Sequence, residues 1–258
     1  MLMMDHAFLN SFFHVSLSYM DIAVLVFASF LGSLVTASLG VGGGAFLIIV
    51  MAEFLAPVVL IPVHGLVQMA SNAGRAWLTR SSVDWDLVKA FLLGGVLASL
   101  LGSFGLHLVP ETVIQWCIAV FILYSCWGKV PEVGLSASFS GRVGGGFVTT
   151  LATLFAGATG PLVASWLRTK SMDRFYYTAN FSTCMTLQHM LKIMVFSFAG
   201  FSFAQWFGLL FLMVISGFIG TKVGLKVLGK LPEKQMKLLF KCILTLLAGR
   251  LIYRLLVA

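Results

Sequence analysis

We predict an all-α polytopic membrane protein built from two inverted-topology repeats of about five helical segments each, and three observations lead to this fold class. First, the 258 residues are 59% hydrophobic and only 10% charged, with a mean hydropathy of +1.00. Second, the apolar residues fall into ten separate segments. Third, glycine-containing interruptions occur at corresponding places in the two halves. A chain of this composition is expected to fold in a lipid bilayer.

The apolar segments set the order of the expected helices. They run at residues 22–39, 44–56, 59–79, 87–108, 111–127, 142–157, 161–168, 175–199, 204–228 and 233–257. The segments at 44–56 and 161–168 are too short for the ~20 residues of a spanning helix, so each is expected to enter only part of the bilayer. Each follows a glycine-containing break, which makes it half of a short glycine-tipped broken or re-entrant helix pair.

The two halves of the chain resemble each other. Aligning residues 39–46 with residues 155–162 also places His64 on Asn180 and Asn72 on Gln188 without a gap. We therefore expect residues 1–130 to form the first transmembrane repeat and residues 131–258 the second, within one membrane domain.

Charge bias predicts the orientation, because Lys and Arg are retained in short cytoplasmic loops. Basic residues mark the loop after 59–79, the linker near 129–142, the loop after 161–168 and the loop near 230–237 as cytoplasmic. The loops at 54–61, 107–111 and 200–204 have no Lys or Arg and are expected outside. The halves then have inverted topology and both termini are external. Arg250 and Arg254 depart from this bias, although long side chains can reach the interface from a helix end.

Four glycines within residues 40–44 interrupt what would otherwise be a continuous apolar helix. Glycine costs about 1 kcal/mol against Ala in a helix interior, so this density indicates a turn or a close backbone approach. Irregular backbone at membrane depth is tolerated where it is buried in protein or lines a watery cavity. The helix that follows the break begins with free N–H groups and the positive end of its dipole, which would face a bound anion. The candidate substrate-binding residues at the two breaks are Gly42, Gly43, Gly44, Ala158, Thr159 and Gly160. A close helix crossing is the alternative explanation.

Polar residues recur within segments 59–79 and 175–199 at spacings of mostly four, which places each set on one helix face. A polar stripe facing lipid is expensive, so these faces are expected in the bundle interior or along a watery pathway. The candidate substrate-binding residues on them are His64, Gln68, Asn72, Arg75, Asn180, Gln188 and Lys192. Interhelical hydrogen bonding is the alternative for the amides, and contact with the outer headgroups is the alternative for Lys192.

The nine Asp and Glu residues all fall at termini, loops or expected helix ends. A basic interior without acids favours an anionic substrate. His64 and His189 could each be a hydrogen-bonded core histidine or part of a proton relay. The chain has no basic stripe for nucleic acid, no Walker loop and no metalloprotease motif, so we expect no nucleic-acid partner, no cofactor, no metal and no enzymatic activity. The four cysteines, Cys117, Cys126, Cys184 and Cys242, lie inside apolar runs and are expected to be reduced.

Several of these motifs resemble the TauE/SafE family, the sulfite exporter and toluene sulfonate uptake permease group. The resembling residues are the glycine run at 40–44, Val83-Asp84-Trp85 before the next span, Gly94, Gly95 and Gly102 leading to Pro110-Glu111, and a degenerate second copy at 157–162. The resemblance covers nearly the whole chain. It implies export or import of sulfite, sulfonates and similar small organosulfur anions across the bacterial inner membrane.

The leading hypothesis is therefore a secondary transporter of a small organosulfur anion such as sulfite, a sulfonate or a sulfoacetate-like molecule, bound near the midplane between the two glycine loops. A passive anion channel is one alternative. A membrane-embedded binding or assembly subunit is another. The expected partners are the small anionic substrate and the lipid bilayer, and two copies could assemble as a homodimer.

Overall fold

A computed structural model describes residues 17–105, 108–128, 135–167, 173–227 and 233–257. Within these residues it contains ten α-helices and no strand. The helices are α2 (Tyr19–Leu39), α3 (Gly43–Met51), α4 (Pro57–Leu78), α5 (Trp85–Gly105), α6 (Glu111–Trp127), α7 (Phe139–Ala156), α8 (Gly160–Leu167), α9 (Arg174–Phe198), α10 (Phe207–Val227) and α11 (Glu233–Val257). Short 3-10 helices form at η1 (Arg80–Ser82), η3 (Leu135–Ala137) and η4 (Phe203–Trp206). Each predicted apolar segment corresponds to one α-helix, with ends that differ by a few residues.

Polar side chains set several of the helix starts. The Ser18 hydroxyl accepts a hydrogen bond from the Asp21 N–H, and the Asp21 carboxylate accepts one from the Ser18 N–H, which forms a capping box before α2. Asp173 accepts hydrogen bonds from the backbone N–H groups of Phe175 and Tyr176 at the start of α9. These caps satisfy N–H groups that have no partner within the helix.

The helices have the length and surface of membrane-spanning segments. Among the described residues, α2, α5 and the stretch Phe203–Val227 are long and apolar enough to cross a membrane, and α6 is a shorter apolar helix. Large apolar side chains also face outward, and Phe104 and Leu246 are each 74% exposed. An outer surface of this kind suits lipid rather than water, so the chain is an all-α membrane protein.

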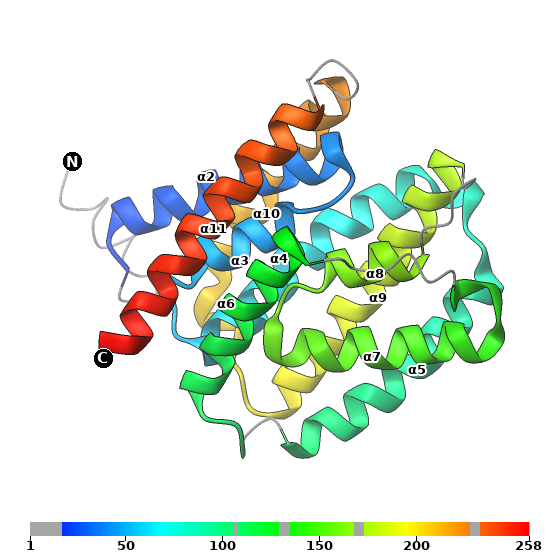
Figure 1. Cartoon of the computed structure of the whole chain (residues 1–258), viewed down its shortest axis with the longest axis horizontal. Helices are drawn as coiled ribbons and strands as arrows, with labels where there is room; N and C mark the ends of the chain where they lie inside the picture. Colours follow the sequence, from blue (N-terminus) through cyan, green and yellow to red (C-terminus); the bar gives the residue numbers. More distant parts are fainter. Residues whose placement is uncertain (1–16, 106–107, 129–134, 168–172, 228–232, 258) are drawn as a thin grey trace.

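Closely packed helix pairs organise the bundle. Helix α2 packs on α10, α5 on α7, α4 on α9 and α6 on α11. In Figure 1, α4 and α9 lie in the middle of the molecule, with α2 and α10 on one side and α5 and α7 on the other. A Cβ atom at Gly220 of α10 would lie 2.2 Å from the Phe30 carbonyl oxygen, and one at Gly146 of α7 would lie 2.0 Å from that of Phe91. Glycine at these crossings lets the backbones touch, as in many membrane bundles.

A pair of ionic contacts joins the segment after α3 to the end of α11. The Glu53 Oε2 atom lies 3.2 Å from Arg250 Nε and 3.2 Å from Arg254 Nη1. Glu53 therefore pairs with both of the arginines that depart from the loop charge bias. The contact also shows that the C-terminal end of α11 lies at the same end of the bundle as the segment that follows α3.

Candidate functional site

The first helix break lies between α2 and α3. Gly40 and Gly42 have φ values of 89° and 110°, a backbone conformation that side chains with a Cβ rarely adopt, so these two positions require glycine. Helix α3 begins at Gly43, and Gly42 in front of it provides no side-chain cap. The first N–H groups of α3 are therefore free to meet a ligand at the helix start.

The second break lies between α7 and α8, and α9 holds it in place. Gly157 has a φ of 73°, and α8 begins three residues later at Gly160. The Lys192 Nζ atom donates a hydrogen bond of 2.8 Å to the Gly157 carbonyl oxygen. The Gln188 side-chain amide donates one of 2.9 Å to the Thr159 hydroxyl oxygen. Two polar side chains of α9 thus bind the backbone and side chain of this break.

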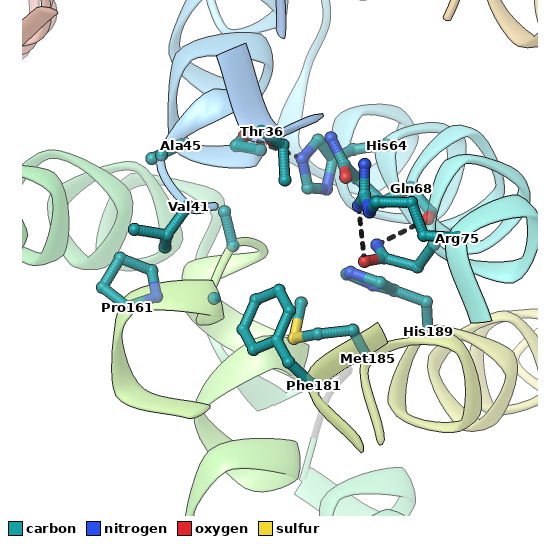
Figure 2. A pocket seen from close by; sticks show the side chains of 15 residues that line it. Thr36, Val41, Ala45, His64, Gln68, Arg75, Pro161, Phe181, Met185 and His189 are labelled. Atoms are coloured by element: carbon teal, nitrogen blue, oxygen red, sulfur yellow. Dashed lines mark hydrogen bonds between the residues drawn. The ribbon is translucent and has the colours of Figure 1, made fainter. Parts of the chain in front are cut away.

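A small cavity lies where the two breaks face each other, and Figure 2 shows it from close by. Its lining comes from the first break, α4, the second break and α9. The lining residues are Thr36, Val41, Gly42, Gly44, Ala45, His64, Gln68, Asn72, Arg75, Ala158, Gly160, Pro161, Phe181, Met185 and His189. The cavity volume is about 20 Å³, which has room for about one water molecule. This space is smaller than a polyatomic anion, and the protein encloses it only in part.

The charged group in the cavity wall is the Arg75 guanidinium of α4. Arg75 is 4% exposed. Its Nη2 atom donates a hydrogen bond of 2.7 Å to Asn72 Oδ1, and its Nη1 atom donates one of 3.4 Å to the Ser71 hydroxyl. Both partners are neutral, and no Asp or Glu among the described residues pairs with this guanidinium. A buried cation without a counter-ion favours a negatively charged ligand, because such a ligand would offset its desolvation.

The remaining polar wall lies next to the start of α3. His64 Nε2 donates a hydrogen bond of 2.9 Å to the Gly44 carbonyl oxygen. A Cβ atom at Gly44 would lie 3.4 Å from the Gln68 side-chain amide. Glycine at position 44 therefore leaves space beside that amide, which could donate a hydrogen bond to a ligand in the cavity.

The structure brings most of the candidate residues together. Eight of the thirteen line the cavity, namely Gly42, Gly44, His64, Gln68, Asn72, Arg75, Ala158 and Gly160. Five lie outside its lining, namely Gly43, Thr159, Asn180, Gln188 and Lys192. Each of these five has a structural contact that accounts for its position.

Gly43 is a packing glycine, because a Cβ atom there would lie 1.7 Å from the Gly32 carbonyl oxygen of α2. The side chains of Gln188 and Thr159 are directed to the Thr149 carbonyl oxygen of α7, to which both donate hydrogen bonds. Lys192 is fully buried, so its ammonium group does not reach the outer headgroups. Its role in the structure is to bind the carbonyl oxygen at the end of α7.

Asn180 holds the segment before α5 against α9. Its Oδ1 atom accepts a hydrogen bond of 2.8 Å from the Asp84 N–H. The Asp84 carboxylate in turn accepts hydrogen bonds from the Leu87 N–H and the Tyr176 hydroxyl. Partial burial raises the pKa of this carboxyl, but these hydrogen bonds and the nearby Arg142 outweigh that effect and hold the pKa below its ordinary value. The Val83-Asp84-Trp85 motif is thus part of a polar contact between α5 and α9.

Several cavity residues were missed by the sequence analysis as site candidates. On α9 they are Phe181 and Met185, which share a spacing of four with His189, a residue that the sequence analysis considered for a proton relay but not for substrate binding. This face lies one residue further along than the predicted stripe through Asn180 and Gln188. Thr36, Val41, Ala45 and Pro161 also line the cavity and lie within a few residues of the two breaks. Their proximity to the glycine motifs is the signal that could have found them.

The fold is that of an all-α membrane protein, and a narrow cavity with a buried guanidinium in its wall lies between the two helix breaks. Residues 25–251 match the family described as Sulfite exporter TauE/SafE. The chain belongs to this family of membrane transporters for sulfur anions. No curated protein and no solved structure matches the chain.

Proposed function

We propose that the protein is a secondary transporter that binds a small organosulfur anion, such as sulfite, a sulfonate or sulfoacetate, in the cavity between the two helix breaks. The observation that carries this proposal is the buried Arg75 guanidinium in the cavity wall, which has only neutral partners. A sulfonate or sulfite group would supply the missing negative charge and accept hydrogen bonds from Arg75 and from the first N–H groups of α3.

The narrowness of the cavity favours a carrier over a passive channel. A channel in its conducting state has a continuous path wide enough for its ion, whereas the site of a carrier lies between broken helices that rearrange to admit the substrate. The cavity volume of about 20 Å³ supports the second arrangement, because the helices must move apart before a polyatomic anion can enter. We take the two breaks and α9 as the elements that move.

The helix pairing supports two inverted repeats, with α2–α6 in the first and α7–α11 in the second. Exchanging the repeats converts the α2–α10 pair into the α7–α5 pair. The same exchange maps α4–α9 and α6–α11 onto themselves. A pseudo-two-fold axis that passes close to the cavity would produce this pattern, and the opposite charge bias of corresponding loops in the two halves favours an axis in the membrane plane.

We further propose that the protein lies in the bacterial inner membrane with both termini outside. The loop charge bias supports this orientation. The Glu53 contacts with Arg250 and Arg254 support only that the loop at 54–61 and the end of α11 lie on the same side of the membrane. The loop at 54–61 and the end of α11 would then both face the outside.

The decisive experiment uses the purified full chain in liposomes. Uptake of labelled sulfite, sulfoacetate and taurine is measured against protein-free liposomes prepared in parallel. We expect saturable uptake of at least one of these compounds without any partner protein. Uptake that does not saturate with substrate concentration would favour a passive channel, and no uptake of any of the three compounds above the protein-free background would contradict the transport proposal.

A further inference from the structure

Two buried histidines face each other at the cavity. His64 of α4 and His189 of α9 have ring centroids 5.9 Å apart and an angle of 77° between the rings. They are 0% and 1% exposed. Both line the cavity, and Figure 2 shows the His189 ring directed towards it beside Arg75. Anion binding through Arg75 and the helix start leaves the role of these imidazoles open.

The hydrogen bonds of the two rings differ. His64 Nε2 carries its proton in any state, because its partner, the Gly44 carbonyl oxygen, can only accept. His64 Nδ1 and both ring nitrogens of His189 have no hydrogen-bond partner among the described residues. Leaving a buried polar atom unpaired costs about 1–3 kcal/mol, so a ring with two such atoms calls for a functional reason. His189 is therefore the ring that is free to bind a proton or a ligand.

The charges around His189 are positive. On α4 the facing groups are His64 and Arg75, and on α9 itself Lys192 lies one turn further along. Helix α8, which also packs on α9, has no titratable side chain. The other charged groups of the packed elements lie at the opposite end of α9, near Tyr176. They are Arg80, Asp84, Asp86, Lys89 and Arg142.

We propose that His189 is a proton-binding site that couples anion transport to protons, so that one proton and one anion bind together and move together. This inference rests on the proposed transport function. In the empty site, Arg75 and Lys192 oppose a further positive charge on the imidazole. An anion in the cavity supplies negative charge next to the ring and reverses that balance. Because linkage is reciprocal, a proton on His189 then strengthens anion binding by the same factor.

The pair limits the stoichiometry to one proton. Once His189 is charged, a second charge on His64 with its ring only 5.9 Å away would be strongly disfavoured. The proton arrives from the solution on the side to which the cavity opens, binds a free ring nitrogen of His189, and leaves with the anion on the other side. The direction of net transport then follows the combined anion and proton gradients.

The test measures proton uptake on anion binding with the purified full chain. Sulfoacetate is the probe, because its sulfonate and carboxylate groups both stay ionised between about pH 6 and pH 8 and so take up no proton themselves. The protein is titrated in a weakly buffered detergent solution with a pH indicator dye. For the wild type we expect uptake of up to one proton per bound anion, and an affinity about 5-fold or more higher at pH 6 than at pH 8.

Two variants assign the proton to a ring. We expect His189→Gln to bind sulfoacetate with no proton uptake and with an affinity that no longer changes with pH. We expect His64→Gln to bind more weakly, because it loses the contact to Gly44, while still taking up a proton. Proton uptake that persists in His189→Gln but disappears in His64→Gln would overturn the assignment to His189.

The wild type alone separates the two proposals if a variant does not fold. Binding of sulfoacetate without proton uptake and without pH dependence would overturn proton coupling and leave the transport proposal standing. Absence of binding and of liposome uptake for every probe would instead contradict the transport function on which the coupling rests.

Discussion

Replacing Arg75 with Gln separates a binding role from a structural role for the charge in the cavity wall. The guanidinium hydrogen-bonds to Asn72 and Ser71 at 2.7 and 3.4 Å, and both are neutral. A substrate anion would therefore form the charge-assisted contact that the empty protein lacks. Such a hydrogen bond contributes about 1.5–3 kcal/mol, and 1.4 kcal/mol corresponds to a tenfold change in affinity, so Arg75→Gln should raise Kd about 10- to 100-fold.

The same substitution should leave the stability of the empty protein unchanged or increase it. A buried cation without a counter-ion carries a desolvation cost that a neutral amide of similar shape largely avoids. Thermal unfolding in detergent measures this effect, and anion binding to the same sample measures the affinity. Loss of affinity together with retained stability is the expected combination.

Arg80→Gln is the matched control. Arg80 has the same charge as Arg75 and lies five residues further along, but its side chain is exposed. Its Nη1 atom donates a hydrogen bond to the Trp77 carbonyl oxygen, and its guanidinium carbon lies 4.5 Å from the centroid of the Trp77 ring. We expect Arg80→Gln to bind the anion with wild-type affinity. Unchanged affinity in Arg75→Gln, accompanied by a fall in unfolding temperature, would refute the binding role and make Arg75 a structural residue.

Three further predictions follow from the contacts of the site. Lys192→Met should lower the unfolding temperature, since it removes the shorter of the two hydrogen bonds that the Gly157 carbonyl oxygen accepts and leaves only the one from the Thr153 hydroxyl; unchanged thermal unfolding would contradict this. Gly44→Ala should fold normally and weaken anion binding. Gly43→Ala should unfold at a lower temperature, because its methyl group would meet the backbone of α2. The reverse result would make Gly43 the binding glycine and Gly44 the packing glycine. A cysteine at Ala56 should react with a membrane-impermeant maleimide added outside and one at Ser138 should not, while equal labelling would reject the orientation.

The order of helices and the location of the two breaks could be predicted from the sequence. Apolar segments separated by polar loops determine where helices form in a membrane, because lipid cannot satisfy an open backbone. The breaks are local as well, since Gly40, Gly42 and Gly157 have φ values that other residues rarely adopt. The face of α4 that carries His64, Gln68, Asn72 and Arg75 also lines the cavity as a single stripe.

The rotation of α9 and the partners of its polar side chains depended on tertiary structure. A spacing of four identifies helix faces but does not say which face meets the cavity, and neighbouring faces differ by one residue, about 100° of rotation. Packing turned Met185 and His189 into the cavity, and it turned Gln188 and Lys192 towards carbonyl oxygens of the second break and of α7. A broken helix leaves carbonyl oxygens without their usual partners within the helix, and the sequence does not specify which side chain of a neighbouring helix will reach them.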